Sequence, residues 1–136
     1  MAKRPRGSSW RRASAGRSAR FEELVQRALD TIPNPFSRAL EEVAIVIEDE
    51  PSRQQRLDSG LRRGEGLYGL YEGTPRSEYG AEWTFEPNKI TLFQTALMED
   101  FPDPEELEHE VWVTVVHELA HHMGIPDERL HDLGLD

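Results

Sequence analysis

Apolar side chains recur at steps of three and four residues over residues 21–32. This period places them on one face of a helix, so the pattern predicts an amphipathic helix that ends before Pro33 and Pro35. A second, short helix is expected over residues 36–42, where Ser37 can act as the N-cap and good helix formers follow.

Three short apolar runs predict strands further along the chain, at residues 43–47, 67–71 and 89–93. The first run is continuously apolar and β-branched, which predicts burial on both faces. Residues 52–66 are charged and rich in glycine, and residues 76–88 are mostly polar, so both stretches are expected to be loops.

The clearest helix signal lies between Asp103 and Gly124. Asp103 is a favourable N-cap, Pro104 suits the first helical position, and Gly124 is a typical residue at a helix end. Apolar side chains fall on nearly every side of this helix, which is typical of a buried, central element. A further short helix is expected over residues 127–133.

The charge of the chain is divided unevenly. The 136 residues carry a formal net charge of −10, but residues 1–20 hold seven basic and no acidic side chains, which leaves −17 on residues 21–136. We therefore predict a basic, disordered arm over residues 1–20 and one folded domain over residues 21–136. So acidic a domain is a poor partner for nucleic acid, and the basic arm is the one part of the chain that could contact it.

The chain contains no cysteine, so a metal ion could be held only by His, Asp or Glu. The absence of cysteine also suits a reducing compartment. No secretion signal is evident, and no apolar run approaches the about 20 residues that a membrane-spanning helix needs. We expect a cytoplasmic monomer.

Residues 117–127 read HELAHHMGIPD. In a helix, His117 and His121 project from one face about 5–6 Å apart, close enough for both imidazoles to reach one tetrahedral ion. Glu118 follows the first histidine and could accept a proton from metal-bound water without being a ligand. An HExxH motif with Gly and Asp at these distances arises by chance in roughly one such sequence in ten thousand.

A catalytic zinc ion needs a third protein ligand and an open position for water. Gly124 can end the helix with a positive φ, so that the chain folds back and presents Asp127 to the same ion. Glu128, His131 and Asp132 are rival ligands, although the predicted short helix would point them elsewhere.

This segment resembles the HExxHxxGxxD signature of the Asp-zincins, and its HExxHHxGI form is most similar to the small bacterial family of minimal zincin-fold metallopeptidases. The resemblance extends from about residue 36 to residue 135. It implies an α+β, minimal zincin-like single domain, in which a small mixed sheet of three or four strands packs on a central active-site helix. It also implies one zinc ion on His117, His121 and Asp127, Glu118 as the general base, and a peptide or protein substrate.

Two other functions compete with peptide hydrolysis. Metal-dependent ribonucleases of the ribosome-maturation type resemble an H-x3-H-x5-H pattern, whereas this chain has Asp127 at the last position and Glu118 after the first histidine. The second alternative is a non-catalytic binding module stabilised by zinc. A structural zinc site is closed, so it would require a fourth ligand, most plausibly His131 or Glu128.

Other polar residues receive weaker expectations. Tyr68, Tyr71 and Tyr79 could each donate a hydrogen bond to a developing oxyanion, but tyrosines in strands are more often packing residues. His122 is rotated by 100° from His121 and is expected to face away from the metal, as a solvated or outer group. His109 and His131 are assigned no role.

Overall fold

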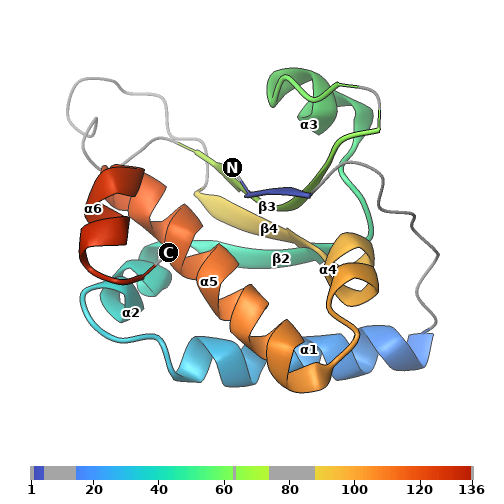
Figure 1. Cartoon of the computed structure of the whole chain (residues 1–136), viewed down its shortest axis with the longest axis horizontal. Helices are drawn as coiled ribbons and strands as arrows, with labels where there is room; N and C mark the ends of the chain where they lie inside the picture. Colours follow the sequence, from blue (N-terminus) through green and yellow to red (C-terminus); the bar gives the residue numbers. More distant parts are fainter. Residues whose placement is uncertain (1, 5–14, 63, 74–87, 136) are drawn as a thin grey trace.

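A computed structural model describes residues 2–4, 15–62, 64–73 and 88–135 of the chain. The domain is α+β, with a four-stranded mixed sheet and helix α5 lying across one face of that sheet (Figure 1). The strands are β1 (Ala2–Arg4), β2 (Ala44–Glu48), β3 (Gly66–Glu72) and β4 (Lys89–Phe93). The helices are α1 (Ala15–Asp30), α2 (Phe36–Ala39), the 3-10 helix η1 (Leu40–Glu42), α3 (Arg53–Asp58), α4 (Gln94–Asp100), α5 (Pro104–Met123) and α6 (Asp127–Asp132).

The strand order in the sheet is β1-β3-β4-β2. Strands β2 and β4 are parallel, whereas β3 runs antiparallel to both β4 and β1. The predicted burial of the 43–47 strand on both faces is wrong, because β2 lies at an edge of the sheet and its residues are exposed or only half-buried. The strand that is buried on both faces is β4, from Ile90 to Phe93.

Most helix predictions are confirmed, and the differences have local causes. The expected 36–42 helix is present as α2 and η1, but Ser37 does not cap it, because its hydroxyl is hydrogen-bonded to the Asn34 side chain. The predicted loop over 52–66 contains α3. The Ser52 hydroxyl and the Gln55 side chain form a reciprocal capping box there, which satisfies two amide groups at the start of the helix.

The N-terminal part of the chain differs from the arm predicted over residues 1–20. Helix α1 begins at Ala15, and residues 2–4 form a strand beside β3. Apolar periodicity could not predict β1, because its three residues, Ala2–Arg4, have no alternating apolar pattern. The strand pairs with the edge of β3 through its backbone, which any side chain allows. Residues 5–14, which include Trp10, lie outside the described residues, as do residues 76–87 of the predicted second loop.

Helix α5 is the buried central helix that its composition predicts. Val111, Val115 and Leu119 are fully buried. They belong to one apolar core that also contains Phe21 of α1 and Leu92 of β4. This packing holds the C-terminal turns of α5 rigidly against the sheet. No helix in the described ranges is long and apolar enough to cross a membrane.

Gly69 of β3 permits the close approach of α5 to the sheet. A Cβ atom at Gly69 would lie 2.6 Å from the Cγ2 atom of Thr114, which is closer than two carbon atoms can approach without displacement. We expect Gly69→Ala to lower the free energy of unfolding by about 1–3 kcal/mol through overpacking. Urea denaturation of this variant, of Thr114→Ser and of the double variant measures the effect. Since serine lacks the Cγ2 methyl, the double variant should recover part of the loss, and purely additive effects would contradict the contact.

Candidate metal centre

The C-terminal end of α5 turns sharply at Gly124. Gly124 adopts a left-handed conformation with φ of 76°, as expected for a glycine that ends a helix. The Ile125 amide then donates to the Ala120 carbonyl over 2.8 Å, and Pro126 leads directly into α6. This turn returns Asp127, the first residue of α6, toward the last turns of α5.

The turn brings together the residues that the sequence singled out. Ligand atoms of His117, Glu118 and His121 lie within 4.8 Å of one another. Asp127 lies outside that compact group, but its Oδ1 atom is 3.5 Å from the Nε2 atom of His117 and 3.5 Å from that of His121. The side chain of Asp127 is 70% exposed, so this side of the cluster is open to solvent.

The distances suit a tetrahedral metal ion. Zinc bonds to nitrogen and oxygen are about 2.0–2.1 Å long, which places two ligand atoms of a tetrahedron about 3.3–3.4 Å apart. The two distances from Asp127 to the histidines are within 0.2 Å of this spacing. Two imidazoles and one carboxylate are also the donor types that catalytic zinc sites use. The residues present therefore fit a metal ion.

Glu118 lies beneath this cluster and is fully buried. Its Oε1 atom accepts a hydrogen bond of 3.2 Å from the Tyr71 backbone amide, and its Oε2 atom is 3.2 Å from Nδ1 of His121. Burial acts to raise the pKa of Glu118. Several interactions lower it, of which the hydrogen bond with His121 is the largest, and together they hold the pKa below its ordinary value. Glu118 is therefore held by contacts from both β3 and α5.

His121 is oriented through both of its ring nitrogen atoms. Nδ1 faces Glu118, whereas Nε2 faces Asp127. The hydrogen bond to the Glu118 carboxylate raises the pKa of His121 above its ordinary value, and burial offsets part of the rise. The ring of His117 meets the ring of His121 edge-on, with 4.9 Å between their centroids. Both rings are therefore held on one side of α5, as the four-residue spacing predicts.

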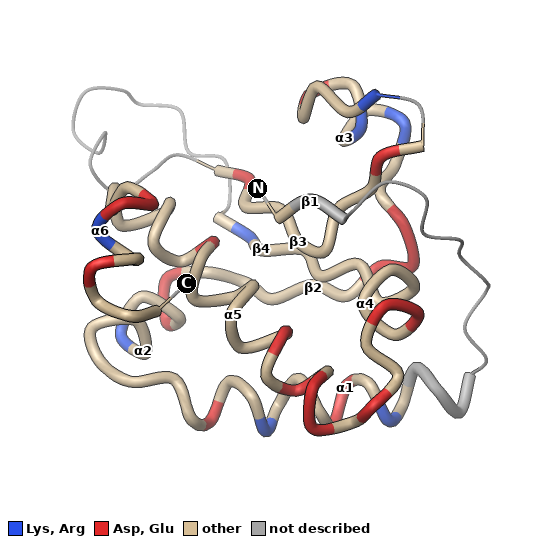
Figure 2. Tube along the Cα trace, in the orientation of Figure 1, with Lys and Arg blue, Asp and Glu red and all other residues tan. Residues whose placement is uncertain are grey.

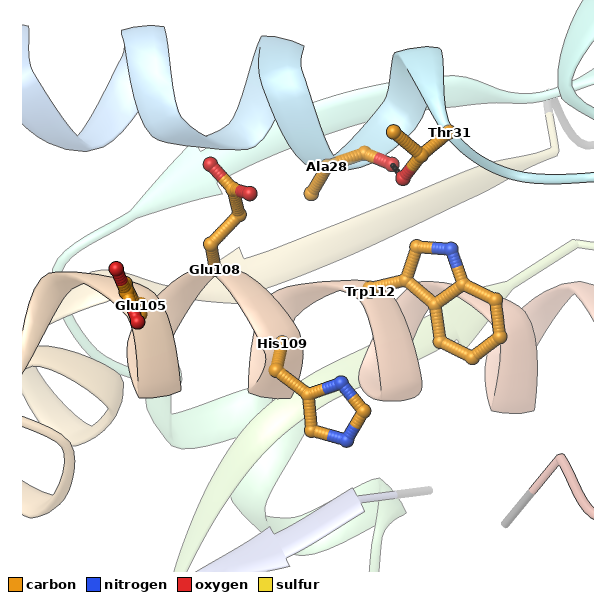
Figure 3. Close-up of a pocket in the computed structure, with 6 residues that line it drawn as sticks. All are labelled: Ala28, Thr31, Glu105, Glu108, His109 and Trp112. Atoms are coloured by element: carbon orange, nitrogen blue, oxygen red, sulfur yellow. Dashed lines mark hydrogen bonds between the residues drawn. The ribbon is translucent and has the colours of Figure 1, made fainter.

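The rival ligands occupy other positions. Glu128, His131 and Asp132 are exposed on α6 and, like Asp127, lie outside the compact group of donors found among the described residues. Asp127 differs from them in its 3.5 Å contacts to both histidines. His109 is eight residues before His117 on α5, or about 12 Å along the helix axis. It helps to line a separate hollow, and Figure 3 shows its side chain pointing from α5 away from Ala28 and Thr31 of α1. Its ring is stacked with that of Trp112.

His122 is not the solvated group that its rotation from His121 suggested. It is fully buried, and it lies between two other elements of the fold. Its Nδ1 atom is 3.2 Å from the hydroxyl of Tyr71 on β3, and its Nε2 atom is 3.0 Å from Oε2 of Glu42 at the end of η1. The histidine therefore links α5 to the strand whose Tyr71 amide donates to Glu118. Glu42 lies 80 residues away in the chain, and no local pattern pointed to it.

The tyrosines considered as oxyanion donors have other partners in the structure. The Tyr68 hydroxyl donates to Asp100 over 2.6 Å. The Tyr71 hydroxyl lies 2.9 Å from the Asn88 side chain as well as near His122. Tyr79 lies outside the described residues. The two described tyrosines thus connect elements of the fold, as the packing interpretation expects.

We expect His122→Phe to lower the free energy of unfolding by about 1–3 kcal/mol, because a similar volume is kept while two buried hydrogen bonds are lost. Thermal or urea denaturation measures the difference. His109→Phe is the matched control, since His109 is exposed on the same helix and its ring contact with Trp112 can be kept. The control should change stability by less than about 0.5 kcal/mol. Equal effects of the two substitutions would contradict a bridging role for His122.

The chain is similar to proteins that are already known. The sequence profile of a family described as Zincin-like metallopeptidase matches residues 40–135. A conserved hypothetical protein from T. thermophilus has a similar structure, with a TM-score of 0.51 and 29% sequence identity over 85% of this chain and 98% of that protein. No curated protein matches the sequence.

Proposed function

This chain belongs to the zincin-like metallopeptidase family, and we propose that it hydrolyses peptide bonds with one zinc ion held by His117, His121 and Asp127. A zinc ion at these ligands would polarise the substrate carbonyl and acidify the attacking water. Glu118 would accept the proton of that water at a carboxylate oxygen and return it to the leaving amine. The substrate is a peptide or protein.

The observation that carries this proposal is the position of Asp127. Its Oδ1 atom is equally far from Nε2 of both histidines, and Glu118 contacts His121 from the opposite side through Nδ1. One cluster therefore offers three possible donors for an ion and, beside them, a separate carboxylate that the proposal assigns to proton transfer. This division of roles is what a hydrolytic zinc site requires.

Two features disfavour the alternative functions. Figure 2 shows Asp and Glu along the first turns of α5, in α4 and after β2, with few Lys or Arg among them, so the domain would repel RNA. A closed structural zinc site would need a fourth protein donor. Glu128 and His131 are exposed on α6, whereas the α6 residue with 3.5 Å contacts to both histidines is Asp127.

Cleavage of a peptide library by the full chain tests the proposal. With stoichiometric zinc we expect cleavage products by mass spectrometry, and we expect them to disappear in the presence of a chelator and to return when zinc is added back. The protein with His117 and His121 both replaced by alanine is the control for a contaminating protease. Cleavage that persists in the chelator, or in the double variant, would contradict the proposal.

A further inference from the structure

Glu118 lies at the outer edge of β3, which is the edge that faces away from β4. Strand β3 pairs with β4 on one side, where Tyr71 lies opposite Ile90. In an antiparallel strand, the amides of alternate residues point to the same edge. Because the Tyr71 amide donates to Glu118, the amides of Gly69 and Leu67 point to this same edge, away from β4. A strand laid along it would run up to the proposed catalytic base.

The N-terminal strand of this chain occupies that edge. Strand β1 pairs antiparallel with β3, with Ala2 opposite Gly69, Lys3 opposite Leu67 and Arg4 opposite Gly66. The antiparallel direction places the N-terminal end of β1 nearest to Tyr71, and therefore nearest to Glu118. A peptide substrate paired in the same way would place the residues that follow its cleaved bond opposite Gly69 to Gly66.

We propose that residues 2–4 of the chain act as an internal competitor of an extended peptide substrate, because β1 is paired with the outer edge of β3 that such a substrate would use. This inference rests on the proposed function, since it concerns the substrate of the same site. Pairing of a peptide with a strand edge is a recurring mode of recognition, in which backbone hydrogen bonds supply the affinity. Displacement of β1 exposes the edge, and the return of β1 closes it.

Charge complementarity favours a basic occupant. Residues 1–20 carry seven basic side chains and no acidic ones, whereas residues 21–136 carry a net charge of −17. The acidic side chains are spread over several elements of the domain (Figure 2). The acidic domain therefore attracts its own basic N-terminal segment, and for the same reason it favours basic peptide substrates.

The competition can be tested by changing the backbone of β1 alone. The double substitution Lys3→Pro/Arg4→Pro removes two adjacent amides, one of which must face β3, and so it prevents normal pairing. Lys3→Ala/Arg4→Ala is the matched control, because it removes the same two charges and keeps both amides. The comparison between these two variants isolates the backbone pairing from the loss of charge.

The probe is a labelled peptide with the sequence of residues 1–8, and its binding is measured by fluorescence anisotropy. All proteins carry Glu118→Gln, so that the probe is not consumed. We expect the proline variant to bind the probe about 10-fold more tightly than the alanine variant, because the competing strand no longer holds the edge. Equal affinities in the two variants, or no binding to either, would overturn the proposal.

Two further readouts separate this inference from the peptidase activity. Hydrogen exchange at the Leu67 and Gly69 amides should be faster in the proline variant than in the alanine variant, and unchanged exchange would also overturn the proposal. In proteins that retain Glu118, the proline variant should show a lower KM at an unchanged kcat. If no protein cleaves any peptide, the proposed function fails, whereas the binding and exchange measurements still decide the role of β1.

Discussion

Replacement of Glu118 with glutamine is expected to reduce peptide hydrolysis by about 100- to 10,000-fold while the protein still binds one zinc ion. The amide has nearly the same shape as the carboxylate and can still accept the hydrogen bond from the Tyr71 amide. It cannot take up a proton from water at neutral pH. Rates from a fluorogenic peptide, together with the zinc content of the purified protein, measure the two effects separately.

Glu110→Gln is the matched control for this experiment, because Glu110 lies on the same helix two turns earlier. It removes one negative charge from α5 and should leave the rate within about twofold, as is usual for a change away from a functional feature. A Glu118→Gln protein that is as active as the parent would remove Glu118 from the mechanism. Loss of zinc together with activity would instead show that Glu118 contributes to metal binding.

Replacement of Asp127 with asparagine is expected to weaken zinc binding by about 100-fold or more. Loss of a group that merely supports a metal ligand already costs about 10- to 100-fold in affinity, and Asp127 is proposed as a direct ligand. Asparagine keeps the size of the side chain but removes the negative charge that lies 3.5 Å from both imidazoles. Competition with a zinc-binding dye at fixed pH measures the affinity.

Asp132→Asn is the control for this substitution, since Asp132 is an exposed aspartate on the same short helix and was a rival ligand in the sequence. Its zinc affinity should stay within about twofold of the parent. Zinc should also raise the thermal stability of the parent and of Asp132→Asn, because a ligand that binds only the folded state stabilises it. A greater loss in Asp132→Asn than in Asp127→Asn would reverse the assignment of the third ligand.

The metal motif and the helix that carries it could be predicted because their signals are local. A spacing of four residues places two side chains on one helix face, whatever the rest of the fold does. Asp103 and Gly124 define the ends of α5 through backbone conformations and hydrogen bonds within a few residues. The position of Asp127 beside the histidines also follows from a short segment, the turn at Gly124.

Other local signals were overlooked or misleading. The capping box of Ser52 and Gln55 is legible in the sequence, but the high charge of the surrounding residues favoured a loop. The β-branched composition of β2 predicted a buried strand, although it is an edge strand. The β-branched residues of a segment indicate that it favours a strand conformation. Whether that strand is buried depends on its position in the sheet, at the edge or in the centre.

The sequence by itself determined the helix that presents His117 and His121 on one face and the membership of the fold in the α+β class, and it predicted the metal ligands. Only the tertiary structure decided the surroundings of Glu118, the buried position of His122 and the pairing of β1 with β3. Tyr71 lies 47 residues from Glu118, and Glu42 lies 80 residues from His122. Periodicity and capping act over a few residues, so contacts of this separation arise only when the strands and helices pack together.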